Sequence, residues 1–279
     1  MLTRISTLGL LLGALCVTGA VCAGQAFRDR IHSDALTVTT GDDIKAEISF
    51  GQNVAARVLG RFKIHDDAAL NRYINLVGTA LAANSGRGEL TFHFAVLESD
   101  SVNAYSTPGG YIFITHGALA LMEDEAELAA VLAHEIAHVS ERHIVNALNI
   151  RATDNSVGGG FSRLIGAGNS TTQVAFTQVV DQAVEILFTK GYQQQDELDA
   201  DRVATLLLST AGYDPLALRR YLERAQAIDD ENSRAMNATH PPSRQRLRSI
   251  DQLVKEEGMD SARLARIKTR FDQHVSHRE

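Results

Sequence analysis

Residues 134–138 constrain this chain more than any other part of it, because they read His-Glu-Ile-Ala-His. They lie in an apolar, alanine-rich run that predicts a helix from about Glu123 to His143. An α-helix turns once in 3.6 residues, so His134 and His138 share a face and can offer two imidazole nitrogens to one metal ion. Glu135 can hold the proton of a water molecule on that metal. Such ligands suit Zn²⁺, and a catalytic zinc site has three protein ligands and an open position.

Two histidines on a helix can also be ordinary surface or core residues. Here the flanking residues are apolar, so the helix is expected to be buried. A charged Glu135 that is buried between two histidines is costly unless something pairs with it. A metal ion removes that difficulty, and we therefore interpret the motif as a metal site.

Composition narrows the class of protein. The chain has 279 residues, of which 44% are hydrophobic and 22% charged, which is typical of a globular protein with a substantial core. Its formal net charge is −7, and no basic surface of the kind that binds nucleic acid is evident. We expect no nucleic-acid partner.

The first 23 residues predict a secretory signal peptide. Arg4 precedes an apolar stretch, Leu8 to Val17, and small residues end at a suitable cleavage site after Ala23. At about ten residues this stretch is too short to cross a membrane, so no transmembrane span is expected in the mature chain. Both cysteines, Cys16 and Cys22, lie in the segment to be removed, which excludes a disulfide or a cysteine ligand.

The pattern after the signal peptide indicates helices with a small sheet. Helical spacing of apolar residues predicts a helix over residues 66–81. Strict alternation over residues 90–96 predicts a half-buried strand, and residues 111–115 predict a second strand after a turn-rich link. Further helices are expected over residues 176–187 and 195–209. The fold class is therefore α+β, mainly α, with a small β-sheet beside the helix of the motif.

Glycines crowd residues 154–172, and this composition predicts a loop. The stretch from Gly158 to Gly168 fits a surface insertion as well as it fits a mobile lid over the site. The sequence leaves open whether this region gates access to the metal.

The third metal ligand does not follow the metzincin pattern. That pattern places a glycine three residues and a histidine six residues after His138, where this chain has Glu141 and Ile144. His143 falls one residue short of the required place. We interpret it as a helix-end histidine that the helix dipole stabilises.

A carboxylate from a later helix is the other option for the third ligand. Glu197 and Asp201 are four residues apart and would share one face of a helix. Glu197 could then bind the metal while Asp201 holds the outer N–H of a ligand histidine. Acidic residues in a first helical turn also satisfy the helix dipole without any metal. The residues alone leave both explanations open.

The order of several motifs resembles one gluzincin family of metallopeptidases, which includes the CaaX prenyl proteases, HtpX and the periplasmic BepA-like proteases. The motifs are HEIAH, then ELDAD at residues 197–201 and Gly-Tyr-Asp-Pro at 212–215, with Asn-Ala-Tyr and Pro-Gly-Gly within 103–110 before them and Thr-His-Pro-Pro at 239–242 after them. The resemblance covers about residues 45–255 in the right order. It implies a single metallopeptidase domain over residues 24–279 with the zincin (gluzincin) fold.

The resemblance also implies roles for individual residues. His134, His138 and Glu197 would hold one zinc ion per chain, and Glu135 would be the catalytic base. Asp201 would stand behind the ligands and support them.

Three further residues receive expected roles. Arg246 would support the ligands together with Asp201. His240, in a loop that the family pattern brings to the site, would donate a hydrogen bond to the oxyanion or act as a fourth ligand at rest; an ordinary turn histidine beside two prolines is the alternative. Tyr192 is a weaker candidate for the same donor role.

Substrate contacts are expected from the strand at residues 111–115. An exposed edge strand can pair with an extended peptide through main-chain hydrogen bonds. Glycines before the strand would permit close backbone approach. The expected contact residues are Gly109, Gly110, Tyr111, Ile112 and Phe113.

Together these features predict a zinc-dependent endopeptidase that cleaves misfolded or unfolded envelope proteins in the periplasm. A lipid anchor on Cys22 is less favoured, because Val21 is a poor residue directly before such a cysteine. The alternative of another class is a zinc-containing chaperone or binding protein of the envelope on a peptidase fold, latent or inactive as a protease. Such a protein would be expected to lose the base, yet Glu135 is present.

Overall fold

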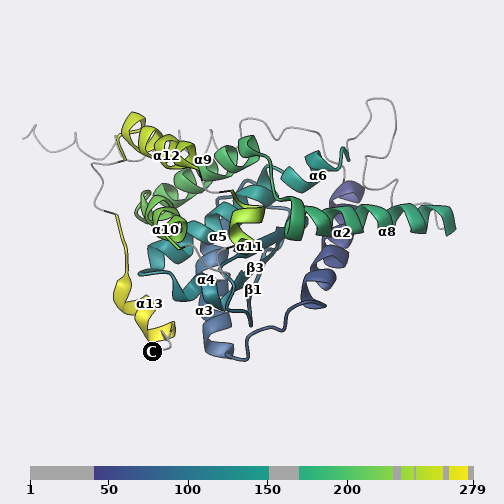
Figure 1. Ribbon diagram of the computed structural model, residues 1–279, viewed down its shortest axis with the longest axis horizontal. Coiled ribbons are helices and arrows are strands. Elements are labelled where there is room, and N and C mark those ends of the chain that lie inside the picture. The colour runs from purple at the N-terminus through teal and green to yellow at the C-terminus, as the bar shows by residue number, and fades with distance from the viewer. Residues whose placement is uncertain (1–40, 151–169, 229–233, 242, 260–263, 276–279) are drawn as a thin grey trace, which may run out of the picture.

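A computed structural model describes residues 41–150, 170–228, 234–241, 243–259 and 264–275 of the chain (Figure 1). The expected signal peptide and the stretch from Gly158 to Gly168 lie outside these residues. The described part consists of a three-stranded sheet and many helices gathered around α5 (Glu125–Ser140). This is the mainly helical α+β fold that the sequence predicts, with a zincin-like placement of the motif on a helix beside the sheet.

The central helix α5 is buried along its whole length. All sixteen of its residues are shielded from solvent, and it packs against α9 (Gln194–Ala211), α3 (Ala68–Ala82) and α10 (Ala217–Gln226). Its first turn is capped by Asp124, whose carboxylate accepts a hydrogen bond from the Glu127 N–H at 3.0 Å. A helix that is packed on every side holds its side chains in fixed rotamers, as a catalytic scaffold requires.

Two buried glutamates in the first turn of α5 fasten it to its neighbours. Glu125 accepts hydrogen bonds from Tyr73 of α3 at 2.9 Å and from Tyr213, just after α9, at 2.6 Å. Glu127 accepts two bonds of 2.9 Å from Arg224 of α10. Each buried charge is thus paired, and the orientation of α5 against three helices is set.

The sheet has the strand order β1 (His93–Leu97), β3 (Tyr111–Thr115), β2 (Ala104–Thr107). β1 runs parallel to β3, and β2 runs antiparallel to it. Side chains alternate between the two faces of a strand. One set therefore packs in the core around α3 and α5, and the other set packs toward α2 (Gly41–Leu59). β1 begins three residues later than the alternation predicted; Phe94 and Val96 are buried, whereas His93 is exposed and Ala95 is partly exposed.

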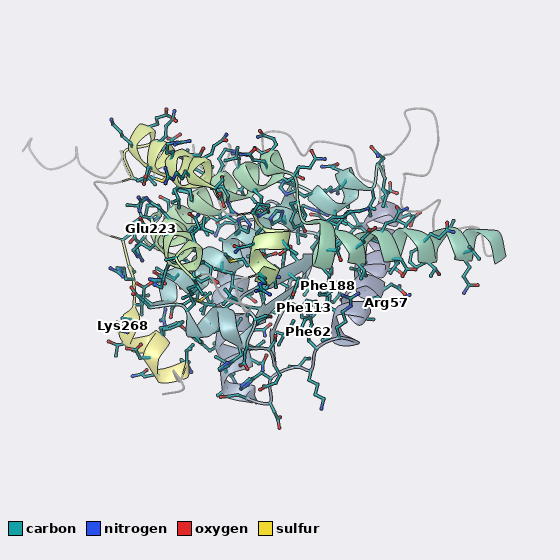
Figure 2. All side chains as sticks on the ribbon, viewed as in Figure 1. Arg57, Phe62, Phe113, Phe188, Glu223 and Lys268 are labelled. Carbon is teal, nitrogen blue, oxygen red and sulfur yellow. The ribbon has the colours of Figure 1, made fainter. Side chains whose placement is uncertain are left out.

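The face of the sheet toward α2 carries an aromatic cluster. Figure 2 shows Phe62, Phe113 and Phe188 close together beside α2. The ring centroids of Phe62 and Phe188 are 6.1 Å apart, and the ring centroids of Tyr105, on β2, and Phe188 are 4.8 Å apart. Phe188 belongs to η1 (Ile186–Lys190), a π-helical turn that continues α8 (Ser170–Glu185). The cluster fixes the chain segment that leads from α8 into the site.

The prediction that residues 111–115 form an exposed edge strand is wrong. β3 is the central strand, and its backbone pairs with β1 on one side and β2 on the other. Gly109 and Gly110 have φ angles of 76° and 94° in the turn between β2 and β3, and a Cβ on Gly109 would lie 2.8 Å from a Cα atom of α2. These glycines serve a turn and the approach of α2. A peptide therefore cannot pair with Tyr111, Ile112 and Phe113.

The remaining elements surround this core. α3 begins after its cap Asp67 and agrees with the predicted helix. No helix among the described residues combines the length and the hydrophobicity needed to cross a bilayer. The other elements are α4 (His116–Ala120), α6 (His143–Ala147), α11 (Arg234–Thr239), α12 (Arg244–Glu256) and α13 (Lys268–His274).

Candidate metal centre

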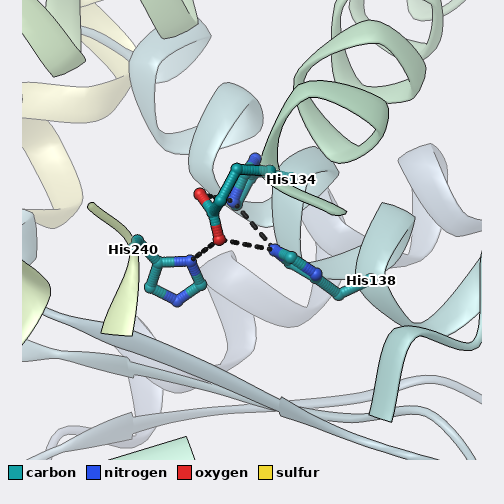
Figure 3. Close-up of side chains that lie close together, drawn as sticks. His134, His138 and His240 are labelled. Atoms are coloured by element: carbon teal, nitrogen blue, oxygen red, sulfur yellow. Dashed lines mark hydrogen bonds and ion pairs between the residues drawn. The ribbon is translucent and has the colours of Figure 1, made fainter. Parts of the chain in front are cut away.

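Four buried side chains from three parts of the chain meet at one point. His134 and His138 come from α5, Glu197 from α9, and His240 from the end of α11 (Figure 3). One nitrogen or oxygen atom of each lies within 4.8 Å of the others. The Nε2 atoms of His134 and His138 are 3.1 Å apart, and the Glu197 carboxylate lies 3.5 Å from His138 Nε2 and 3.6 Å from His134 Nε2.

The start of α9 places the carboxylate at the centre. The Asp196 carboxylate accepts a hydrogen bond from the Gln193 N–H at 3.2 Å, so the helix begins just before Glu197. One turn later, Asp201 Oδ1 lies 3.1 Å from Nδ1 of His134. A carboxylate at that nitrogen favours the tautomer whose Nε2 is free to bind a metal. Glu197 therefore belongs to the metal-binding group, and Asp201 lies behind His134.

Arg246 of α12 compensates the charge of both carboxylates. Its guanidinium lies 2.6 Å from Glu197 and donates two hydrogen bonds of 2.7 Å to Asp201. Burial by itself would raise the pKa of Glu197, but the charges of Arg246 and His240 outweigh burial and hold that pKa well below its usual range. The pKa of Asp201 is lowered in the same way, against burial, chiefly by Arg246. Both carboxylates are therefore ionised.

The outer nitrogen of His138 meets a residue that the sequence analysis placed elsewhere. His143 Nδ1 lies 2.8 Å from His138 Nδ1. The interpretation of His143 as a helix-end residue is wrong, because α5 stops at Ser140 and His143 is the first residue of α6. Arg142 between them has a φ of 56°, a left-handed conformation that turns the chain back toward the site. Burial and the charge of His134 lower the pKa of His143 to about 4, so its ring is neutral.

We expect His143→Ala to weaken zinc binding by about 10- to 100-fold while the protein stays folded. Loss of a group that orients a ligand histidine has an effect of that size. The measurement is a zinc dissociation constant from competition with a chromophoric chelator. The exposed His93 offers a control, and His93→Ala should leave the constant unchanged. Equal constants for wild type and His143→Ala would remove this role from His143.

Glu135 projects beside the four-residue group. Its Oε2 accepts a hydrogen bond of 2.7 Å from Ser106 Oγ, and its Oε1 lies 3.6 Å from His240 Nε2. Ser106 lies on β2, on the face of the sheet that meets α5. The sequence analysis missed this residue because it took residues 103–110 for a turn-rich link. Alternation with Ala104 would have identified it once a strand was recognised there.

Tyr192 lies against the metal ligands. Its ring stacks on His138 with the centroids 3.8 Å apart. Its hydroxyl is buried and faces Ser106 without a hydrogen bond of regular geometry. Burial and the charge of Glu135 raise its pKa well above the usual value, so the phenol keeps its proton. It is therefore a donor without a regular hydrogen bond at the edge of the site.

His240 is held over the site by its neighbours in the chain. The Tyr192 N–H donates to the Thr239 carbonyl at 3.1 Å, and Asn103 Nδ2 lies 3.3 Å from Thr239 Oγ1. A Cβ on Gly191 would lie 2.5 Å from the Ala238 carbonyl, so only glycine lets the two segments approach. His240 Nδ1 reaches Glu197 at 2.9 Å.

The donor set fits a zinc ion. Imidazole nitrogens and a carboxylate are zinc ligands, and this is the group of that kind found among the described residues. Glu197 Oε2 lies between the Arg246 guanidinium, 2.6 Å away, and His134 Nε2, 3.6 Å away. Burial opposes a charge on His134, yet Asp201 and Glu197 raise its pKa to about 9, which shows that the group attracts positive charge.

Comparison with known proteins places this geometry in a family. The sequence model of peptidase family M48 matches residues 68–254, which include the histidine motif, Glu197 and Arg246. The chain belongs to peptidase family M48. The matched part is a zinc metallopeptidase domain, and zinc is the metal of the M48 family.

Three relatives of this M48 chain show which proteins it resembles and over how much of their length. The beta-barrel assembly-enhancing protease of Yersinia pestis is 30% identical over 239 residues, 77% of this chain and 46% of that protein. Mitochondrial metalloendopeptidase OMA1 of Schizosaccharomyces pombe is 29% identical over 66% of this chain and 53% of its own length. Metalloprotease LoiP of Escherichia coli is 23% identical over 84% of this chain and 87% of its own length. The chain thus spans about half the length of the first two.

Proposed function

We propose that this chain is a zinc-dependent endopeptidase that hydrolyses misfolded or unfolded proteins of the cell envelope. The observation that carries the proposal is the position of Glu135, a buried carboxylate with one oxygen held by Ser106 and the other facing the metal-binding group. A non-catalytic zinc site has no need of a fifth polar group in that place. The name of the Yersinia relative, which joins proteolysis to β-barrel assembly, supports the envelope as the setting.

In this proposal His134, His138 and Glu197 hold the zinc. When bound, the ion lowers the pKa of water toward neutrality and polarises the scissile carbonyl. Glu135 accepts the proton of the attacking water and later passes it to the nitrogen of the leaving amine. Ser106 keeps the Glu135 carboxylate turned toward the substrate throughout.

The oxyanion needs a hydrogen-bond donor, and two side chains are candidates. His240 Nδ1 lies 2.9 Å from Glu197 within the four-residue group, and this position supports the second of its two expected roles, that of a fourth ligand at rest. Tyr192 keeps its proton, and its hydroxyl makes no hydrogen bond of regular geometry to a described residue. Tyr192 is therefore the better placed donor in the arrangement described here.

In this proposal the substrate peptide pairs with the edge strand β2, and not with β3 as the sequence analysis expected. The Asn103 carbonyl accepts a hydrogen bond from the Thr115 N–H at 3.0 Å, so residue 103 faces β3. Successive residues of an antiparallel pair alternate in this respect. The backbone groups of Ala104 and Ser106 therefore point away from β3, beside Glu135. An extended peptide could pair with them irrespective of its sequence.

Removal of the metal tests the function. Purified protein should cleave β-casein, and a chelator should reduce the rate at least about 100-fold, because the metal supplies several kcal/mol of transition-state stabilisation. Added zinc should restore it, and circular dichroism should show that the chelated protein is still folded. Casein that is bound but never cut would favour the chaperone alternative. Cleavage that persists after zinc is shown to be absent would contradict the proposal.

A further inference from the structure

The contact between His138 and His143 depends on where α5 ends. His138 must keep Nε2 free for the metal, so its Nδ1 carries the hydrogen and donates it to His143 Nδ1, 2.8 Å away. In an α-helix, residues five positions apart are separated by about 140° around the axis. If α5 continued through residue 143, the two imidazoles would therefore point in different directions.

A single residue makes the turn that brings the two rings together. Arg142 has a φ of 56° and a ψ of 37°, and its side chain makes no capping hydrogen bond at the start of α6. This left-handed conformation is unfavourable for a residue with a Cβ, and it persists where the surroundings enforce it. Two buried charged side chains from other parts of the chain lie near Arg142. They are Glu47 of α2 and Arg87, which follows α3.

Arg87 occupies the hydrogen-bond acceptor that a longer α5 would need. In a continuing α-helix the Val139 carbonyl would accept the N–H of His143, four residues further on. Here that carbonyl accepts a hydrogen bond of 3.1 Å from Arg87 Nη1 and one of 3.2 Å from the Arg142 N–H. The last turn of α5 is thus satisfied without His143.

Glu47 holds both arginines. Its carboxylate accepts hydrogen bonds of 3.0 and 2.9 Å from Arg87 Nη2 and lies 3.5 Å from Nη2 of Arg142. Glu47 and Arg87 are 1% and 4% exposed, so solvent screens their attraction little. Residues 68–254, which match family M48, begin after α2. A helix outside the matched part therefore reaches the end of α5.

We propose that Glu47 is a positioning residue for the metal centre. It holds two arginines where they end α5, and this end turns His143 back onto His138. Glu47 acts through the backbone of Arg142 and not through contact with the zinc. The proposal concerns metal affinity, and it goes beyond the peptidase function because it does not depend on what the protein cleaves.

Zinc affinity, measured by competition with a chromophoric chelator, tests the proposal. Glu47→Gln keeps the shape of the side chain and removes its charge. It should weaken zinc binding about tenfold, the lower end of the effect of losing a group that supports a ligand. Asp42→Asn makes the same chemical change at an exposed position of α2 and should leave the constant unchanged. An unchanged constant in Glu47→Gln that circular dichroism shows to be folded would overturn the proposal.

Substitutions at residue 142 separate positioning from general stability. Glycine adopts the left-handed conformation without strain, whereas alanine keeps the Cβ and lacks the contact with Glu47. Arg142→Gly should therefore bind zinc nearly as tightly as wild type, and Arg142→Ala about tenfold more weakly. A merely structural role would give the opposite order, because glycine loses more conformational freedom on folding than alanine does. In the double variant Glu47→Gln, Arg142→Gly, zinc affinity should return to near that of wild type.

Asn149 provides a control for the type of substitution. It follows α6, is exposed and has a φ of 53°, so it shares the backbone conformation of Arg142. Asn149→Gly and Asn149→Ala should both leave the zinc constant unchanged. A difference between them as large as that between the two variants at residue 142 would overturn the specific part given to Arg142.

Two further results would overturn the proposal. One is weak binding that persists in the double variant, and the other is equal binding by Arg142→Gly and Arg142→Ala. If Glu47→Gln does not fold, the two variants at residue 142 decide alone. Failure of the proposed peptidase function would appear as absence of casein cleavage by zinc-loaded wild type, and the order of the zinc constants would be unaffected by it.

Discussion

Glu135→Gln is expected to bind zinc as tightly as wild type and to lose peptidase activity by about 10²- to 10⁴-fold, the usual contribution of a general base. Glutamine has the shape of glutamate, and its carbonyl oxygen can still accept the hydrogen bond from Ser106 Oγ, which is 2.7 Å long in the wild type. Its amide cannot take up a proton. The change therefore removes proton transfer and leaves the metal ligands in place.

The measurement combines zinc content by mass spectrometry with initial rates of casein cleavage. Glu223→Gln makes the same chemical change on the exposed surface of α10 and should retain both zinc and activity (Figure 2). Activity equal to wild type in Glu135→Gln would show that another group is the base. Loss of zinc together with activity would show that Glu135 supports the metal and would leave its catalytic role without support.

The second large effect is on stability. Arg246→Met is expected to lower the free energy of unfolding of the zinc-free protein by about 3–5 kcal/mol, as expected when one partner of a buried ion pair is removed. Arg246 is 1% exposed, and two buried carboxylates, Glu197 and Asp201, face it. Without the guanidinium both would keep their charges in a dry interior or take up protons. Zinc should offset part of the loss, because it supplies positive charge beside Glu197.

Urea denaturation of chelated and zinc-loaded protein measures this effect. Arg219→Met serves as the control, because Arg219 pairs with Asp251 at 2.7 Å on the surface, with both side chains partly exposed. Such a pair contributes about 1 kcal/mol or less. Equal losses in the two variants would mean that the buried network around Glu197 has no special part in the fold.

Local patterns were sufficient to predict the elements that carry the ligands. The 3.6-residue period around His134 and His138 predicted α5, and the four-residue spacing of Glu197 and Asp201 predicted their shared face on α9. Each of these features depends on neighbours within one or two helical turns. The sequence near Glu197 could not show whether this residue binds a metal or only satisfies the helix dipole. The answer depends on the distance from Glu197 to His138, which is set by the packing of α9 against α5.

Local patterns could not predict the order of the strands or the contact between His143 and His138. A strand such as β3 with apolar side chains can be central or at an edge, and only its pairing with both β1 and β2 decides. His143 reaches His138 because Arg142 adopts a left-handed conformation, which a sequence without glycine at that position does not indicate. Both errors therefore arose where tertiary structure overrides a local preference.

The contact between α5 and α9 has a consequence for the newly made chain. His138 and Glu197 are far apart in the sequence and meet only when these two helices dock. An unfolded chain therefore cannot assemble the ligand set, and it cannot attack other unfolded chains around it. On the proposed function, the chain can cut only after α5 and α9 have docked, when it no longer resembles the unfolded polypeptides proposed as its substrates.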